Sequence, residues 1–168
     1  HKGKLTLEKI GINKASTFMG FCSFHDKNIF ACVEDKEFTG SAEQCFALMY
    51  RSITKEIYAK GGNKIVSEVV KSSDKGRTIS EQVFVQNLAT SFAAGTDVAA
   101  QELNELKSKL DQHLLSKKDI HIKHLLFESS TTIPIVVSSI VSPGHDFQGK
   151  QLQDLGDLSA KAEGVVFN

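Results

Sequence analysis

Three cysteines carry the most reactive side chains in this 168-residue sequence. Cys45 follows Ser41 closely, in the expected first turn of a helix, and a helix N-terminus lowers the pKa of a thiol. The neighbours of Cys45 belong to an apolar stripe, however, and burial raises the pKa instead. Because no histidine is close to it in sequence, we interpret Cys45 as a core residue rather than a nucleophile.

Cys22 and Cys32 fall on opposite arms of a predicted hairpin. A loop at residues 26–28 places them face to face, which would allow a disulfide. A loop one residue shorter sets Cys22 opposite Ala31, where the narrow geometry of a disulfide excludes the bridge. The interpretation that we favour is three free, buried thiols that pack as small apolar side chains.

The histidines do not have the spacing of a metal site. On a predicted strand, His121 and His124 point to opposite faces and cannot share an ion. His25, His113 and His145 are scattered, and no CxxC or HExxH motif occurs. We therefore predict no metal ligands, and we interpret His124 as a core or interface residue.

Motifs for catalysis and cofactor binding are equally missing. The sequence has no GxSxG, GxGxxG or GxxxxGK[ST] pattern. Gly61-Gly62 is interpreted as a helix end before a strand, which is the wrong order for a phosphate loop. We predict no catalytic or cofactor-binding residues and no cofactor. An enzyme whose active residues come from distant positions remains an alternative.

Charge and composition limit the partners. The chain has 20 basic and 20 acidic residues, so nothing favours nucleic acid or an anionic membrane. Phe21, Phe24 and Phe30 lack basic neighbours, and we interpret them as core rather than as base-stacking platforms. No apolar run is long enough to predict a transmembrane segment. The chain begins at His1 rather than Met, which fits a remnant of an expression tag, an excised domain or a mature chain that has lost a signal sequence. The sequence does not separate these three; the third would make a secreted or cell-envelope protein.

Residues 41–60 form the clearest predicted helix. Ser41 is a good N-cap, and Gln44 is placed to complete a capping box. The apolar stripe is Phe46, Met49, Ile53 and Ile57. Glycine closes helices easily, so we expect Gly61-Gly62-Asn63 to end this one.

The rest of the chain is interpreted mainly as strands. Residues 4–12 predict a first strand, and residues 16–24 with 28–34 predict a hairpin with two apolar faces, typical of the centre of a sheet. Residues 64–72 and 77–85 predict a second hairpin around a turn at 73–76, in which Gly76 takes a positive φ. Residues 119–128 and 132–141 predict two later strands.

A second helix is expected over residues 97–116, capped by Thr96. Its stripe comprises Ala99, Leu103, Leu106, Leu110 and Leu114, and Glu105 and Lys109 form an i,i+4 pair. In the tail, Leu152, Leu155 and Leu158 suggest a short docked helix, and residues 165–167 suggest a closing strand. Residues 143–168 are expected to dock loosely.

Taken together, these patterns predict one α+β domain over residues 1–168. It would have an antiparallel sheet of six to seven strands with two main helices, around 41–60 and 97–116, packed on it. We expect a non-catalytic domain that binds a protein partner, within a larger or membrane-anchored protein. The alternative is a carrier of a small hydrophobic ligand, with an apolar pocket between sheet and helices.

Overall fold

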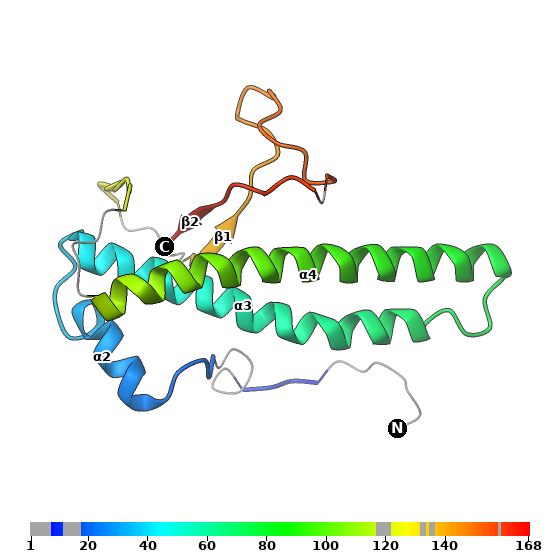
Figure 1. Cartoon of the computed structure of the whole chain (residues 1–168), viewed down its shortest axis with the longest axis horizontal. Coiled ribbons are helices and arrows are strands. Elements are labelled where there is room, and N and C mark those ends of the chain that lie inside the picture. Colours follow the sequence, from blue (N-terminus) through cyan, green and yellow to red (C-terminus); the bar gives the residue numbers. More distant parts are fainter. Residues whose placement is uncertain (1–7, 12–17, 117–121, 132–133, 135–136, 158) are drawn as a thin grey trace.

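The computed structural model describes residues 8–11, 18–116, 122–131, 134, 137–157 and 159–168. These residues form three helices and one antiparallel sheet of two short strands. The predicted sheet of six to seven strands is therefore wrong. Two long helices, α3 and α4, lie side by side along the molecule, and α2 packs at one end of the pair (Figure 1).

Helix α2 (Ser23–Glu34) replaces the first predicted hairpin. Its inward face buries Phe30 and Cys32, and the ring of Phe30 lies 4.0 Å beneath the guanidinium of Arg51 on α3. Arg51 also pairs with Glu34 in the last turn of α2. Residues 28–34 are apolar on both faces when drawn as a strand, which suggested the centre of a sheet. In the structure they belong to a helix with a wide apolar stripe.

Helix α3 (Ala42–Ser72) begins where the sequence indicated and continues much further than expected. Ser41 is the N-cap, and its hydroxyl accepts a hydrogen bond from the Gln44 amide at 3.3 Å. Gly61-Gly62-Asn63 does not end the helix: all three residues are helical, and neither glycine adopts a positive φ. Residues 64–72 are therefore helical rather than a strand.

The Gln44 side chain does not complete the expected capping box. Its amide nitrogen donates to the carbonyls of Cys32 (2.9 Å) and Glu37 (2.8 Å). Its oxygen accepts from the backbone N–H (2.8 Å) and the hydroxyl (3.1 Å) of Thr39. One buried side chain thus fastens the end of α2 and the connecting loop to the first turn of α3.

A turn over residues 73–76 joins α3 to α4, and Gly76 has a φ of +81°, as predicted. The turn connects two helices rather than two strands. Helix α4 (Ile79–Ser116) begins well before the predicted cap at Thr96, which lies buried in its middle. Thr78 directly precedes the helix, and its hydroxyl (2.7 Å) and N–H (2.9 Å) donate to the Glu81 carboxylate and lower the pKa of Glu81.

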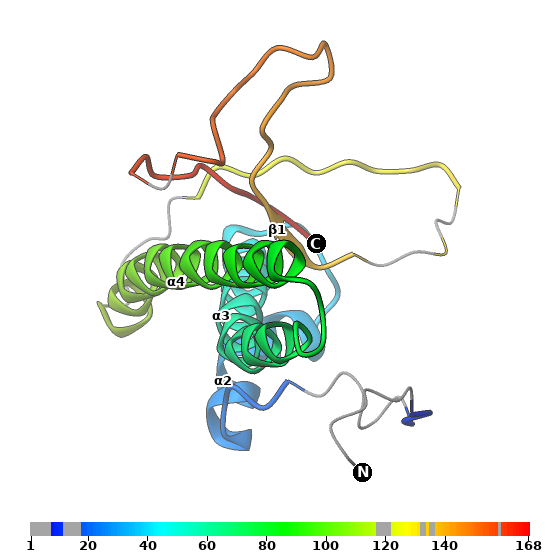
Figure 2. The same cartoon turned by 90° about the vertical axis from the view of Figure 1, so that its right-hand side faces the viewer.

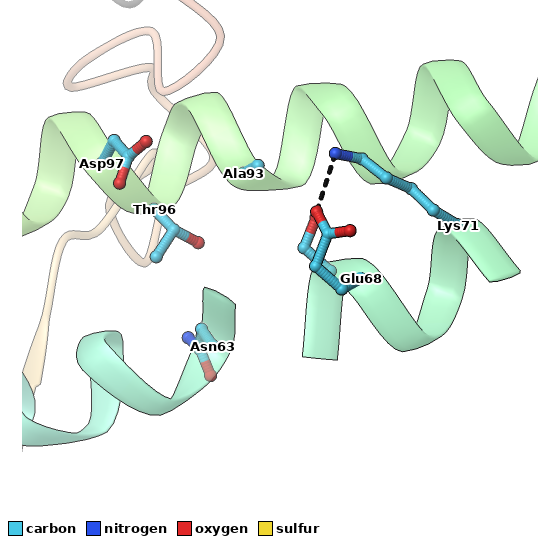
Figure 3. Close-up of a pocket in the computed structure, with 7 residues that line it drawn as sticks. Asn63, Glu68, Lys71, Ala93, Thr96 and Asp97 are labelled. Atoms are coloured by element: carbon cyan, nitrogen blue, oxygen red, sulfur yellow. Dashed lines mark hydrogen bonds and ion pairs between the residues drawn. The ribbon is translucent and has the colours of Figure 1, made fainter. Parts of the chain in front are cut away.

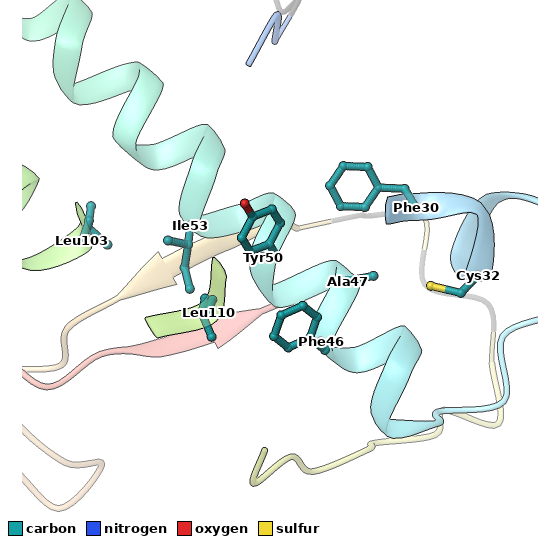
Figure 4. Packing of buried hydrophobic residues seen from close by; sticks show 8 residues of the cluster. All are labelled: Phe30, Cys32, Phe46, Ala47, Tyr50, Ile53, Leu103 and Leu110. Atoms are coloured by element: carbon teal, nitrogen blue, oxygen red, sulfur yellow. The ribbon is translucent and has the colours of Figure 1, made fainter. Parts of the chain in front are cut away.

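The core lies where α2 and the C-terminal half of α4 meet the first half of α3 (Figure 4). The predicted stripes of the two long helices are confirmed there. The residues of these stripes that are buried or packed against the core are Phe46, Met49, Ile53, Ile57, Leu103, Leu106, Leu110 and Leu114. Phe30 is buried and Phe21 packs edge-on against it, as expected, but Phe24 is exposed.

The C-terminal segment, residues 137–157 and 159–168, folds back over the helices (Figures 1 and 2). Strand β1 (Ser139–Val141) pairs with β2 (Val165–Phe167), with Ile140 opposite Val166, and both strands contact α3. The closing strand is confirmed. Residues 8–11 and 122–131 form no strand, and residues 152–157 form no helix; the rest of those predicted elements, including Leu158, lies outside the described residues.

None of the described helices has a stretch that is both long and apolar enough to cross a membrane.

Candidate functional site

The half of the α3–α4 hairpin that lies beyond the core has a seam of small and polar side chains. Ser67, Ala89 and Thr96 are buried there, and the Ser67 hydroxyl donates to the Ala89 carbonyl at 3.2 Å. Gln86 reaches across to the Lys71 carbonyl at 3.0 Å. Small residues let the helices approach closely, but they bury little apolar area.

The large apolar side chains of this part of α4 are exposed rather than buried in the seam. Phe84, Leu88 and Phe92 are spaced i, i+4 and i+8, so they share one face of the helix. Their exposed fractions are 68%, 54% and 44%. We call these three residues the Phe–Leu–Phe stripe. Hydrophobic residues on an isolated surface helix normally face the core, so this arrangement is inverted.

The helix around the stripe carries no charge. Residues 82–96 include no Asp, Glu, Lys or Arg, and the nearest charges along the helix are Glu81 and Asp97. Four turns of exposed helix without a charged side chain are unusual on a solvated surface, whereas charge depletion is typical of the centre of a protein interface.

The stripe continues along the same face of α4 into a cleft. Gly95, Ala99 and Leu106 extend its helical spacing and form part of the wall of a cleft of about 520 Å³ between α4 and the C-terminal segment. Its further apolar lining comes from Val98, Leu103, Ile140, Leu155, Ala160 and Ala162. Its charged lining comprises Glu56, Lys60, Glu102, Lys109, Asp154, Asp157 and Lys161.

Polar contacts hold the C-terminal segment over this cleft. The hydroxyls of Ser52 and Ser138 lie 2.9 Å apart, and both bond the Asn168 side-chain oxygen, at 2.7 and 2.9 Å. Lys161 pairs with Glu105 at 3.3 Å. Hydrogen bonds from Gln101 and Lys161 lower the pKa of Glu105, and the charges of Lys161 and of Lys109, its predicted i,i+4 partner, act in the same direction.

A second, smaller cleft of about 210 Å³ lies between the two long helices (Figure 3). Asn63, Thr96 and Asp97 line it, together with Glu68 and Lys71, which form an ion pair at 3.0 Å. We assign this cleft no chemistry.

The cysteines are all free, in agreement with the favoured interpretation, but only Cys32 is fully buried. Burial raises the pKa of both Cys32 and Cys45, so Cys45 is not activated by its helix terminus. Cys22 is exposed as the N-cap of α2, with its sulfur 3.2 Å from Nδ1 of His25. Sequence reasoning missed this contact, although the i,i+3 spacing permits it.

One polar cluster in the hairpin is structural. The Tyr50 hydroxyl donates to Asp111 at 2.7 Å, and Lys107 bonds the same carboxylate at 2.8 and 3.0 Å. Burial alone raises the pKa of Asp111, but the bonds from Lys107 and Tyr50 and the charge of Lys107 outweigh it and lower the pKa. Burial and the bond to Asp111 raise the pKa of Tyr50. The cluster ties α3 to α4.

Among the described residues, no group of three or more His, Cys, Asp or Glu side chains is placed to hold a metal ion. His124 is exposed rather than a core residue, and His121 lies outside the described residues.

No protein-family model, no curated protein and no solved structure matches this chain.

Proposed function

We propose that this chain is a non-catalytic interaction domain that binds an amphipathic helix on the Phe–Leu–Phe stripe of α4. The observation that carries the proposal is the inverted pattern of the hairpin, with small and polar residues in its seam and its large apolar residues outside. An exposed apolar patch of this kind marks an interaction site on a soluble protein.

The chemistry of the surface specifies the partner. A helix lays an apolar face on another helix through anchors at i, i+4 and i+8, which is the spacing that the stripe itself presents. Because residues 82–96 are uncharged, a charged partner face would lose its hydration without gaining an ion pair. The partner face should therefore be apolar and uncharged.

A synthetic helical peptide tests this proposal. It carries Phe, Leu and Phe at i, i+4 and i+8 on an Ala- and Gln-rich face, with lysines on the opposite face. Its control has the same composition, with the three apolar residues on different faces. Fluorescence anisotropy at about 1 µM protein should show binding of the first peptide alone, weakened at least ~10-fold by Leu88→Glu, because a charge is then buried unpaired.

The matched control variant is Leu115→Glu, which changes a leucine of the same helix that is 84% exposed and lies on another face. It should bind the peptide as the wild-type chain does. Equal binding of both peptides, or of neither, would contradict the proposal.

The cleft between the C-terminal segment and α4 supports a second function, the carriage of a small apolar ligand. Its volume of about 520 Å³ falls in the range of ligand pockets, and Leu103, Leu106, Ile140 and Leu155 give it an apolar floor. Native mass spectrometry of the purified chain should then show a mass excess that disappears on denaturation. An unliganded mass would oppose a tightly held ligand.

A further inference from the structure

We propose that the helix bound by the Phe–Leu–Phe stripe is α4 of a second copy of this chain, so that two hairpins pair into a four-helix assembly. This inference rests on the proposed function and adds the identity of the partner. It would make residues 82–96 the centre of a symmetric dimer interface.

The spacing of the stripe is self-complementary. Phe84 and Phe92 lie four residues on either side of Leu88, so the pattern is the same when it is followed in the opposite direction. When two such helices meet antiparallel around a two-fold axis, Leu88 contacts Leu88 of the second copy and Phe84 contacts its Phe92. This is the isologous contact by which most homodimers are built.

The charges around the stripe favour the same arrangement. An antiparallel pairing centred on Leu88 sets Glu81 opposite the uncharged Gly95 of the second copy, and Asp97 opposite its Ile79. A parallel pairing in register would set each acid beside its own copy, where like charges repel. Two-fold pairing thus keeps the acids at both ends of the stripe away from the acids of the second copy.

The architecture of the hairpin also calls for two more helices. Bundles of four helices bury a central stripe from each helix, whereas a two-helix hairpin has only one seam. Here that seam is made by Ser67, Gln86, Ala89 and Thr96. A second hairpin against the exposed side of α4 would bury the aromatic residues that the seam leaves in water.

The area involved predicts a weak dimer. A buried aromatic side chain contributes roughly 150–250 Å², so the stripe exposes on the order of 350 Å² at its observed exposures. A stable complex buries about 800 Å² on each partner. The stripe supplies somewhat less than half of this area, and its flanks must supply the remainder. We therefore expect association in the micromolar range.

Sedimentation velocity on the full chain, from about 5 to about 300 µM, tests the inference. The wild-type chain should shift from monomer to dimer as its concentration rises. Leu88→Glu and Leu88→Lys should each remain monomeric, because like charges would meet on the axis. An equimolar mixture of the two should associate at least ~10-fold more tightly than either alone, because opposite charges then face each other.

Leu115→Glu is again the control and should dimerise like the wild-type chain. Circular dichroism should show unchanged helix content, and Phe84→Ser provides a second variant in case a Leu88 variant does not fold. A wild-type chain that is monomeric throughout, a dimer that survives Leu88→Glu, or a mixture that fails to associate would each overturn the inference. Peptide binding by a monomeric chain would overturn only the inference and leave the proposed function standing.

Discussion

The most informative single substitution in the folded core is Gln44→Met. Gln44 is 3% exposed, and its amide group makes four hydrogen bonds, two donated and two accepted. Methionine keeps the length and volume of the side chain but removes all four bonds. The substitution therefore isolates hydrogen bonding from packing, because no cavity is created.

The expected loss follows from where the partners lie. The bond to the Cys32 carbonyl is fully buried, so its removal leaves an acceptor without water, at a cost of about 2 kcal/mol. The bonds to Thr39 and the Glu37 carbonyl are only partly buried, and water replaces part of each, at about 0.5 kcal/mol for each bond. The free energy of unfolding should fall by about 3.5 kcal/mol.

Urea denaturation followed by circular dichroism measures this difference. For a chain of this size it corresponds to a fall in Tm of roughly 10 °C. The control is Gln101→Met, because Gln101 is exposed and makes one hydrogen bond, to Glu105, so its loss should stay within about 0.5 kcal/mol. A loss below about 1 kcal/mol for Gln44→Met, with an unchanged m-value, would refute the assignment of Gln44 as the fastening between α2 and α3.

Three further predictions concern other parts of the chain. A thiol reagent at pH 8 should modify exposed Cys22 first and half-buried Cys45 more slowly, and Cys32 should react only on unfolding; mass-spectrometric time courses would contradict this if Cys32 reacted early. The pKa of Asp111 is lower in the folded state than in the unfolded state. The Asp111 carboxylate therefore stabilises the fold fully above its unfolded pKa of about 3.9, and this stabilisation is lost as the pH falls through its folded pKa. The stability difference between the wild-type chain and Asp111→Asn should thus shrink below about pH 4 in urea titrations, and a constant difference would count against the ion pair. Gly76→Ala should cost about 1 kcal/mol, because φ is +81° with open space around the position, and a neutral effect in thermal denaturation would argue against that turn.

The elements that sequence reasoning located correctly have a local physical cause. Ser41 caps α3 because its hydroxyl satisfies an amide that has no partner within the helix, and this depends on four consecutive residues. Gly76 takes a positive φ because the turn at 73–76 requires it, whatever the turn connects. The apolar stripes through Ile53 and Leu110 follow from the helical period alone.

The elements that sequence reasoning misassigned depend on partners far away in the chain. Residues 64–72 and 77–85 are rich in valine and isoleucine, which favour strands, so a turn between them suggested a hairpin. β-branched residues cost a helix only some tenths of a kcal/mol each, and packing of α3 against α4 outweighs that preference. The same packing carries α3 through Gly61-Gly62, which costs about 1 kcal/mol per glycine relative to alanine.

The Phe–Leu–Phe stripe escaped notice for a related reason. Once residues 77–85 were interpreted as a strand, Phe84 and Leu88 belonged to different elements and their four-residue spacing lost its meaning. The signal that was available is the absence of charge over residues 82–96, which no local motif captures. An uncharged run of this length within a long helix is evidence about what surrounds the helix rather than about the helix itself.

The two halves of α4 differ in the apolar surface that they bury within the chain. From Leu103 to Leu110 the helix buries leucines against α3, and this half supplies the core. Towards Phe84 the side chains between α3 and α4 are small, and they bury little apolar area. The aromatic side chains of this half are exposed instead. Exchanging those aromatics for the alanines of the seam would bury more area within the monomer. A sequence that instead keeps them outside gives up monomer stability at this end of the hairpin, and binding another helix there would bury that apolar area.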